Sequence, residues 1–449
     1  MDWTKLPDLA AVALLTCAFA SVARRGQTPV SRLWLTGWVL IALHFVAFMF
    51  LPSPEFLGEL AADVGVAALP AAGLLFTYAS IPYRREQSSR WMLTVLLLTN
   101  TSYVCLLNAS PAANWALVPA AALIGIAPLL VSLLALNRFR HPLRWIIVTF
   151  YCLLAVFILI VQNRPNYGAD LALDAVLFTV YFVCCIHFWF TYRRATAGAF
   201  ITISGFLAWA FVFVVGPCLE AFYPTVHIES EVWNLPKYVV AVGMILLLLE
   251  DQLQHNTYLA LHDELTGLPN RRLFQDRLTG ALERARRSDS KVALLVIDLD
   301  RFKQVNDTLG HHFGDILLQQ VGLLLAGRVR NCDTVSRTGG DEFSVILEGT
   351  ANVDDANKVA RSLFVSLNEP IEIEGRAVHI GASIGVALYP DDASEMEALC
   401  IAADMRMYEE KNMARDIMRQ AFTGKIPPQG VVQYAIRPDL RIASENLSA

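Results

Sequence analysis

The hydrophobic and polar positions divide this 449-residue chain near residue 250. Before that point long apolar runs with few ionic residues follow one another, and after it the acid and base content is that of a globular domain. A helix needs roughly 20 residues to cross a hydrocarbon core about 30 Å thick, and nine runs come close to that length. They are residues 7–23, 33–51, 57–81, 91–109, 113–136, 143–163, 171–192, 197–222 and 233–250. The pattern predicts an α-helical polytopic membrane domain over residues 1–250, with about nine spans, or eight if the first and weakest run does not cross.

Basic residues are distributed unevenly over the connections between these runs. Eleven fall in alternate connections: Arg24, Arg25, Arg32, Arg84, Arg85, Arg90, Arg138, Arg140, Arg144, Arg193 and Arg194. The other connections hold only Lys5, Arg164 and Lys237. Because basic residues concentrate on the cytoplasmic side of a membrane, this bias predicts an N-terminus outside and a cytoplasmic chain after the last span.

Several polar residues interrupt the apolar runs: His44, Glu59, Asp63, Asn100, Asp174, His187 and Glu220. An ionisable group inside a membrane is costly, so the members near the outer leaflet are candidates for a ligand pocket open to the outside. Interfacial solvation or hydrogen bonds between helices are the alternative, and haem ligation by His44 and His187 is a further one without a supporting motif. The sequence has no internal repeat of the kind found in many transporters.

The composition agrees with a membrane protein, since 55% of the residues are hydrophobic and 17% are charged. A net charge of -5 without a broad basic patch argues against a nucleic-acid partner. The eight cysteines lie mostly in apolar runs without metal-ligand spacing, which predicts buried, reduced thiols. The N-terminus lacks the basic segment of a cleaved signal peptide.

A helical connector is predicted over residues 251–262, directly after the last apolar run. Spacings of three and four residues link Leu246, Leu249, Leu253, Asn256 and Ala260. This seam is typical of a short parallel coiled coil with Asn256 setting the register, but a single amphipathic helix has the same pattern. In either case a signal from the membrane half has to pass through this helix.

Acidic residues occur at the ends of two predicted strands in the second half. The run KVALLVIDLD, residues 291–300, predicts a buried strand that ends in Asp298 and Asp300, with a helix after it. The stretch SRTGGDEFSVIL, residues 336–347, predicts a hairpin in which two glycines supply positive φ and leave room for a ligand at the backbone. Asp341 and Glu342 follow these glycines. If the strand lies beside the hairpin, Asp298 and Asp341 converge, as hard cations such as Mg²⁺ require.

The second half closely resembles the GGDEF family of diguanylate cyclases in sequence. The matching stretches are DELTGLPNRRLF (263–274), IDLDRFKQVNDTLGHHFGD (297–315), RTGGDEF (337–343), ASIGVALYP (382–390) and MYEEKNMAR (407–415). The resemblance implies an α/β palm-like fold, similar to that of adenylyl cyclases, over residues 263–418. It also implies the condensation of two GTP into cyclic di-GMP and two pyrophosphates, and a homodimer, since each domain holds one GTP. Residues 419–449 form a C-terminal extension to which we assign no function, although VVQYA within it is a candidate short strand.

The resemblance also implies roles for individual residues. Asp298, Asp341 and Glu342 are the expected catalytic residues, and with the Leu299 carbonyl they are the expected ligands of Mg²⁺, for which Mn²⁺ is an alternative. The expected contacts to GTP are Asn306 and Asp315 at the guanine, Gly339 and Gly340 through their amides, and Lys411, Arg415, Lys303 and Arg337 as cations. A product-inhibition site would comprise Arg330, Asp333 and Arg361. The chain departs from the family pattern at Ala414 and Asp416, where Gly and Asn are common.

Three functions are compatible with this architecture. The first is a diguanylate cyclase of the bacterial inner membrane, multi-pass, with its GGDEF domain in the cytoplasm, regulated by the membrane domain and acting in biofilm formation. The second is a non-catalytic receptor that binds GTP or cyclic di-GMP. The third, a transporter with a nucleotide domain, lacks a visible substrate path. The intact acids favour the cyclase, and no phosphodiesterase signature accompanies them.

Overall fold

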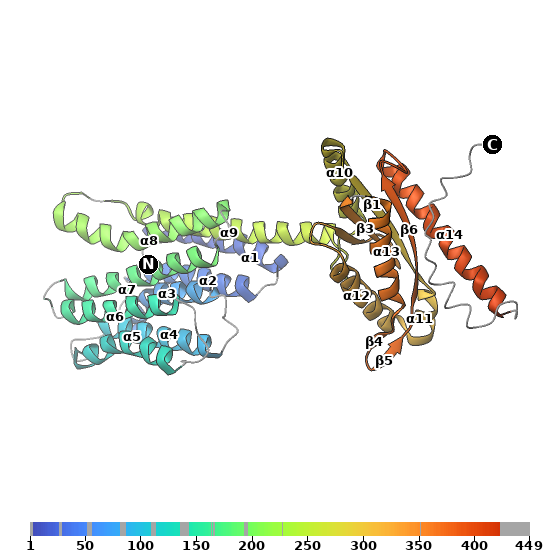
Figure 1. Ribbon diagram of the computed structural model, residues 1–449. Coiled ribbons are helices and arrows are strands. Elements are labelled where there is room, and N and C mark those ends of the chain that lie inside the picture. The colour runs from blue at the N-terminus through green and yellow to red at the C-terminus, as the bar shows by residue number, and fades with distance from the viewer. Residues whose placement is uncertain are drawn as a thin grey trace. The chain divides into compact units, whose positions relative to one another are not determined.

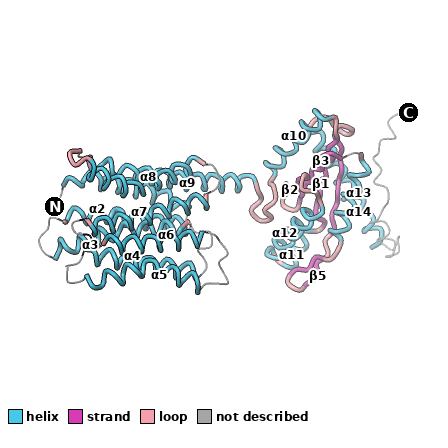
Figure 2. Tube along the Cα trace, turned by 60° about the vertical axis from the view of Figure 1, so that its left-hand side comes forward, coloured by secondary structure: helices cyan, strands magenta, loops and turns pink. Residues whose placement is uncertain are grey.

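The computed structural model describes residues 3–26, 29–51, 56–80, 87–108, 114–134, 143–162, 164, 167–192, 196–226, 228–350 and 352–422. The chain forms two compact units, Met1–Gln254 and His255–Ala449. The first is helical in its described residues, whereas the second combines strands and helices (Figures 1 and 2). The α-helical region followed by an α/β domain confirms the predicted fold class.

Nine α-helices occupy the described part of the first unit, one for each predicted apolar run. They are α1 (Leu6–Gly26), α2 (Pro29–Phe50), α3 (Phe56–Ala79), α4 (Gln87–Asn108), α5 (Asn114–Leu134), α6 (Leu143–Val161), α7 (Gly168–Thr191), α8 (Ala197–Phe222) and α9 (Ser230–Leu261), preceded by the 3₁₀-helix η1 (Trp3–Lys5). Among the described residues, eight helices are long and apolar enough to cross a membrane. The shorter apolar helix is Trp145–Val161 in α6, not the first helix. The number of spans and their orientation therefore stay predictions.

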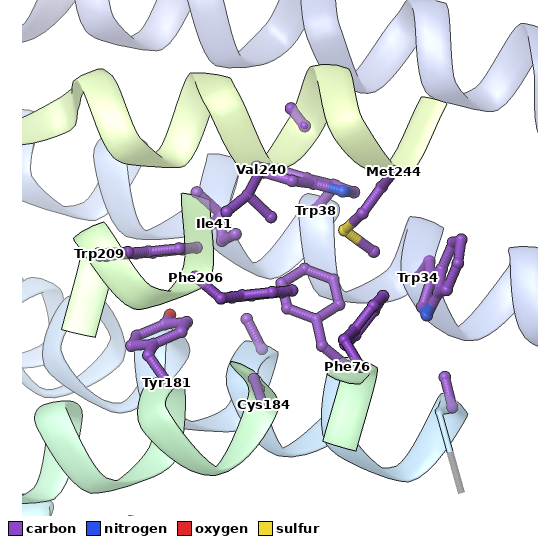
Figure 3. Close-up of a cluster of buried hydrophobic side chains, with 14 of the residues drawn as sticks. Trp34, Trp38, Ile41, Phe76, Tyr181, Cys184, Phe206, Trp209, Val240 and Met244 are labelled. Carbon is purple, nitrogen blue, oxygen red and sulfur yellow. The ribbon is translucent and has the colours of Figure 1, made fainter. Parts of the chain in front are cut away.

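Aromatic side chains fill the core of the first unit (Figure 3). Trp34 and Trp38 of α2, Phe76 of α3, Tyr181 of α7 and Trp209 of α8 are all almost fully buried. The rings of Tyr181 and Trp209 stack with centroids 3.8 Å apart. Because the rings come from four helices, this core holds helices together that are distant in sequence.

The polar residues predicted within the membrane half lie in different environments. His44, Asn100 and His187 are buried, whereas Glu59 and Glu220 are exposed. The His44 Nδ1 atom lies 2.7 Å from the Gly65 carbonyl oxygen, and Asn100 donates to the Leu96 carbonyl at 2.8 Å. The His44 contact joins α2 to α3, which is the hydrogen bond between helices considered above, whereas the Asn100 bond lies within α4.

The last apolar run and the predicted connector form one helix, α9, of 32 residues. Leu249 and Leu253 of the predicted seam are 38% and 65% exposed in this single chain. The seam is thus available to a partner, and its pairing in a coiled coil stays a prediction.

The second unit is built on a four-stranded antiparallel sheet in the order β2-β3-β1-β6. Its elements are α10 (Arg271–Ser288), β1 (Lys291–Asp300), α11 (Phe302–Leu309), α12 (His311–Arg328), β2 (Thr334–Arg337), β3 (Glu342–Thr350), α13 (Val353–Asn368), β4 (Ile371–Ile373), β5 (Arg376–Val378), β6 (Gly381–Tyr389) and α14 (Met396–Phe422). Strands β4 and β5 form a separate hairpin. Two helices, not one, separate β1 from the β2–β3 hairpin, because Gly310 interrupts the helical segment with a φ of 91°. The candidate strand VVQYA lies outside the described residues.

Both faces of the sheet are covered, which explains why β1 is apolar throughout. Ala293, Leu295 and Ile297 pack with α12 and α13, whereas Val292 and Leu294 pack with α10 and α14. Asp298 continues the second set, since alternate strand residues share a face. Its carboxylate is therefore directed toward the α14 side of the sheet, where the candidate site lies.

Candidate active site

The β2–β3 hairpin carries the two glycines and the two acids identified in the sequence. The amides of Thr338 and Gly339 donate to the Glu342 carbonyl at 3.0 and 3.3 Å. Neither Gly339 nor Gly340 has the positive φ that the sequence predicted, so this prediction was wrong. A Cβ atom on Gly339 would lie 2.6 Å from Glu342 Oε2, whereas one on Gly340 would meet nothing within 4 Å. A Cβ atom on Gly339 would thus crowd the Glu342 side chain, which would have to shift, and Gly340 leaves the exposed backbone open.

The sheet brings the acids of β1 and the hairpin together. Asp298 on β1 lies directly opposite Glu342 on β3 in the strand register. The amide of Leu299 donates to the Asp341 carbonyl at 3.2 Å. The predicted juxtaposition of the first strand with the hairpin is thus observed.

A positive side chain completes this group of acids. Lys411 of α14 donates to Asp298 Oδ1 at 2.6 Å, and Asp298 is buried. Burial raises the pKa of Glu342, the charges of Asp298, Asp341 and Asp404 raise it further, and Lys411 lowers it. The acids therefore repel one another, and an additional cation would relieve that repulsion.

The neighbouring Asp300 is held separately. Its carboxylate accepts a hydrogen bond from the Ser383 hydroxyl on β6 at 2.9 Å. Burial raises the pKa of Asp300, and the charge of Asp298 adds to this effect. The bond to β6 gives Asp300 a structural contact that Asp298 does not share.

The donor atoms fit a divalent cation that is shared with a substrate. Among the described residues, no three His, Cys, Asp or Glu side chains lie close enough to form a complete metal site. Mg²⁺ is usually bound through one or two carboxylates together with water and substrate phosphates. Asp298, Asp341 and the Leu299 carbonyl provide that kind of partial ligand set.

Arg337 links the hairpin to Asp263, and we call this set of contacts the brace. Its Nη1 atom lies 2.9 and 3.1 Å from the two carboxylate oxygens of Asp263, and its Nε and Nη2 atoms donate to the Gly340 carbonyl at 3.1 and 2.6 Å. Asp263 also accepts from the amide and hydroxyl of Thr266. Although partial burial raises the pKa of Asp263, these bonds from Thr266 and Arg337 outweigh it and hold the pKa below its ordinary value. Arg337, expected as a phosphate-binding cation, thus has its guanidinium engaged with protein atoms.

Asp263 is the residue of this site that the sequence did not identify. It follows the end of α9 and precedes Thr266 by three residues, a spacing typical of a side-chain-capped turn. That spacing indicates a turn, but its partner Arg337 is 74 positions away.

The α11–α12 corner presents the two residues expected at the guanine base. Asn306 Oδ1 is buried and has no hydrogen-bond partner among the described residues. A Cβ atom on Gly314 would lie 1.8 Å from this oxygen, so the amide fits only against a glycine. Asp315, the next residue, is exposed. The corner therefore presents the exposed Asp315 carboxylate and, once the Asn306 side chain turns from Gly314, a second oxygen acceptor; guanine has N1 and N2 hydrogens for such acceptors.

The remaining expected site residues lie on the surface. Lys303 on α11, Arg415 on α14, Arg330 and Arg361 are exposed. Asp333 is anchored to the main chain instead, because its carboxylate accepts from the amides of Arg330 (2.9 Å) and Glu348 (3.2 Å).

Residues 260–416 match the protein family described as "Diguanylate cyclase, GGDEF domain". The matched residues lie in the second unit, which therefore contains a GGDEF domain. The chain is 42% identical over 174 residues to the diguanylate cyclase TpbB of Pseudomonas aeruginosa, which covers 38% of this chain and 40% of TpbB. It is 41% identical over 193 residues to MucR of the same organism, named a bifunctional diguanylate cyclase/cyclic di-GMP phosphodiesterase, covering 40% of this chain and 28% of MucR.

The response regulator PleD of Caulobacter vibrioides is 37% identical over 171 residues, with 37% of each chain covered. A crystal structure of the TpbB GGDEF domain matches with 42% identity and a TM-score of 0.33, covering 33% of this chain and 92% of that one. The chain spans less than half the length of these three curated relatives, and the similarity covers the GGDEF domain.

Proposed function

We propose that this protein is a membrane-bound diguanylate cyclase that condenses two GTP into cyclic di-GMP and two pyrophosphates. The observation that carries the proposal is the group of acids at the hairpin: Asp298 faces Glu342 across two strands, and Leu299 is hydrogen-bonded to Asp341. A domain that only bound nucleotide would have no need to hold mutually repelling carboxylates together.

In each half-reaction a ribose 3′-hydroxyl attacks the α-phosphorus of the partner nucleotide, the new P–O bond forms as the bond from the α-phosphorus to the α–β bridging oxygen breaks, and pyrophosphate leaves while the hydroxyl proton passes to solvent. Positioning and charge neutralisation supply most of the catalysis in such transfers. Bound Mg²⁺ or Mn²⁺ would neutralise the phosphate charge, held by Asp298, Asp341 and the Leu299 carbonyl. Glu342 would orient the attacking hydroxyl or support the metal.

In this proposal Asn306 and Asp315 select guanine over adenine. The Asn306 oxygen, which has no hydrogen-bond partner among the described residues, would gain a donor from guanine if its side chain turns from Gly314 toward the base. Adenine presents no equivalent donor pair, so a site with these acceptors rejects ATP by leaving buried polar groups unpaired.

Lys411 would exchange partners during the cycle. Its bond to Asp298 neutralises that carboxylate in the free protein. With a cation held at Asp298, the Lys411 ammonium group would be available to the terminal phosphates. Arg415 and Lys303 are exposed cations that would bind the same phosphates.

The proposal includes a homodimer, because each domain holds one GTP and the two must face each other. The exposed seam of α9 supports such pairing. It further includes location in the bacterial inner membrane, regulation through the membrane domain, and a role in biofilm formation.

The test is turnover of purified full-length protein with GTP and Mg²⁺, with products resolved by chromatography. We expect cyclic di-GMP and pyrophosphate, no product without divalent metal, and recovery with Mg²⁺ or Mn²⁺. Metal-assisted charge stabilisation amounts to several kcal/mol, so Glu342→Gln is expected to lose about 100-fold or more in turnover. Glu348→Gln on the same strand is the matched control and should keep activity. Nucleotide binding without any turnover would instead favour the non-catalytic receptor.

Product inhibition is tested separately by adding cyclic di-GMP to the assay. Arg330→Ala is the cleaner variant, because Asp333 also supports two main-chain amides. Inhibition should be relieved in Arg330→Ala, and unchanged inhibition would remove this site from the proposal.

A further inference from the structure

The first unit contains a cavity of about 170 Å³ where α1 begins, α2 ends and α9 begins. The basic-residue pattern predicts that this end of the helices faces outside. Its lining includes Lys5, Asp8, His44, Phe48, Trp233 and Asn234. The cavity is therefore partly polar and partly aromatic, as ligand sites commonly are.

A buried hydrogen-bond network includes two lining residues of this cavity, Asp8 and Asn234. Asp8, only 1% exposed, accepts from the Tyr238 hydroxyl and from the Asn234 side-chain amide, both at 2.7 Å. Asn234 in turn accepts from the ammonium group of Lys237. Both carboxylate oxygens of Asp8 thus accept from neutral donors, and the Asn234 side chain bridges the Asp8 carboxylate and the Lys237 ammonium group.

Lys237 has no direct counter-ion among the described residues. It is 8% exposed, and its single hydrogen bond there is to Asn234, while the Phe45 ring centroid lies 5.1 Å from its Nζ atom. An ammonium group has three donors, so two remain for a ligand or water. A buried charge without a direct partner is unfavourable, and an anion would relieve this.

The charges at the described lining of the cavity are unbalanced. Lys5 and Asp8 line the cavity and Lys237 bonds to the lining residue Asn234, which gives two positive charges against one negative among these residues, while Glu231 of α9 is exposed and outside the described lining. His44 bonds to the Gly65 carbonyl oxygen through Nδ1 and needs no charge to do so. One additional negative charge would balance the site.

The cavity walls indicate what else the ligand carries. Phe48 and Trp233 line the space, whose volume is several times the roughly 30 Å³ of one water molecule. A simple inorganic anion would leave these aromatic surfaces without contacts. A small organic acid with an aromatic or branched apolar body would fill the space and supply the missing charge.

We propose that this cavity binds a small, water-soluble monocarboxylate, with its carboxylate at Lys5 and directed toward the Lys237 ammonium group behind Asn234, and its apolar body between Phe48 and Trp233. Trp233, Asn234 and Lys237 all belong to α9, which continues without interruption to Leu261. Ligand binding would therefore act on the helix that leads into the GGDEF domain.

The experiment uses the full-length protein in nanodiscs of phosphatidylcholine, with benzoate as the probe and isothermal titration calorimetry as the readout. Benzamide, of the same shape without the charge, should bind at least about tenfold more weakly than benzoate. Lys237→Met, Lys5→Met and Trp233→Leu should each weaken benzoate binding by about tenfold or more. The matched control is Arg164→Met, which removes a cation outside the cavity and should change nothing.

Three results would overturn the proposal: no benzoate binding up to about 10 mM, equal binding of benzamide, or unchanged binding in the two lysine variants. Lys5 and Trp233 are only half-buried, so their variants keep the test valid if Lys237→Met does not fold. Nanodiscs with added phosphatidylglycerol provide the last arm. Loss of benzoate binding there would assign the site to an acidic lipid headgroup and reject a soluble ligand, whereas retained binding supports the proposal. Because binding is measured directly, failure here leaves the proposed cyclase activity untouched.

Discussion

The brace between Asp263 and Arg337 is expected to control both stability and catalysis of the GGDEF domain. Asp263→Asn keeps the size of the side chain but removes its charge and one acceptor oxygen. The two side chains are 24% and 12% exposed, so the pair is much better shielded than a surface ion pair. Hydrogen bonds to charged groups contribute about 1.5–3 kcal/mol, and exposed pairs less than about 1 kcal/mol. We expect a loss of about 1–2 kcal/mol in the free energy of unfolding.

The same change is expected to slow turnover. Arg337 also binds the Gly340 carbonyl, so loosening its guanidinium moves the hairpin that carries Asp341 and Glu342. Misplacement of a catalytic group by a fraction of an ångström commonly costs tenfold or more, and we expect about a tenfold lower kcat.

Two measurements on the full-length protein check this prediction. The melting temperature should fall by about 2–8 °C for a unit of this size, and turnover should fall in the same preparation. Asp391→Asn is the matched control. It breaks the exposed ion pair between Lys291 Nζ and Asp391 Oδ2, which are 2.6 Å apart, and this pair does not involve the hairpin. Unchanged melting and turnover in Asp263→Asn, with the control also unchanged, would refute the idea that this brace positions the hairpin.

Three further predictions follow from other contacts of the second unit. Partial burial raises the pKa of Asp392, but hydrogen bonds from Arg406 and a main-chain amide outweigh it and hold the pKa below its ordinary value. The contribution of Asp392 to stability is therefore present above about pH 4 and is lost as pH falls through the lowered pKa. The free energy of unfolding, measured from pH 6 to 3, should be less pH-dependent in Asp392→Asn. Gly314→Ala would place a Cβ atom 1.8 Å from Asn306 Oδ1 and should raise the KM for GTP about tenfold or more with a smaller effect on kcat, whereas unchanged KM would contradict the guanine assignment. Gly385→Ala would place a Cβ atom 2.0 Å from the backbone of α14, so we expect roughly 1–3 kcal/mol of destabilisation in thermal melts, and a wild-type melting temperature would show that α14 yields freely.

The elements that sequence predicted well are those fixed by local pattern. Each apolar run before residue 250 became a helix, and the run 291–300 became a strand because both faces of the sheet are covered. The acids at the hairpin were also identified, since their motif lies in one short stretch.

The contacts that sequence missed join residues far apart in the chain. The motif predicts Arg337 as a phosphate-binding cation, and in the structure Asp263, 74 positions earlier, binds its guanidinium group. Lys411 reaches Asp298 across 113 positions. The prediction of positive φ at Gly339 and Gly340 was wrong for a different reason. The motif indicates a hairpin, but it does not specify the φ values in the turn or the Glu342 side-chain contact near Gly339.

The continuity of α9 has a consequence for its angular phase. A helix of 32 residues is about 48 Å long and rotates by about 100° per residue, so each end has a defined azimuth relative to the other. Inserting one residue turns everything beyond it by about 100°, whereas inserting seven turns it by about 700°, within 20° of two full turns. Pro236 lies near the beginning of this helix, beside Lys237, so an amide hydrogen is missing there and the helix can bend without losing phase further along. In the proposed homodimer, the length of α9 modulo one helical turn, more than its sequence, would determine which faces the two copies present to each other.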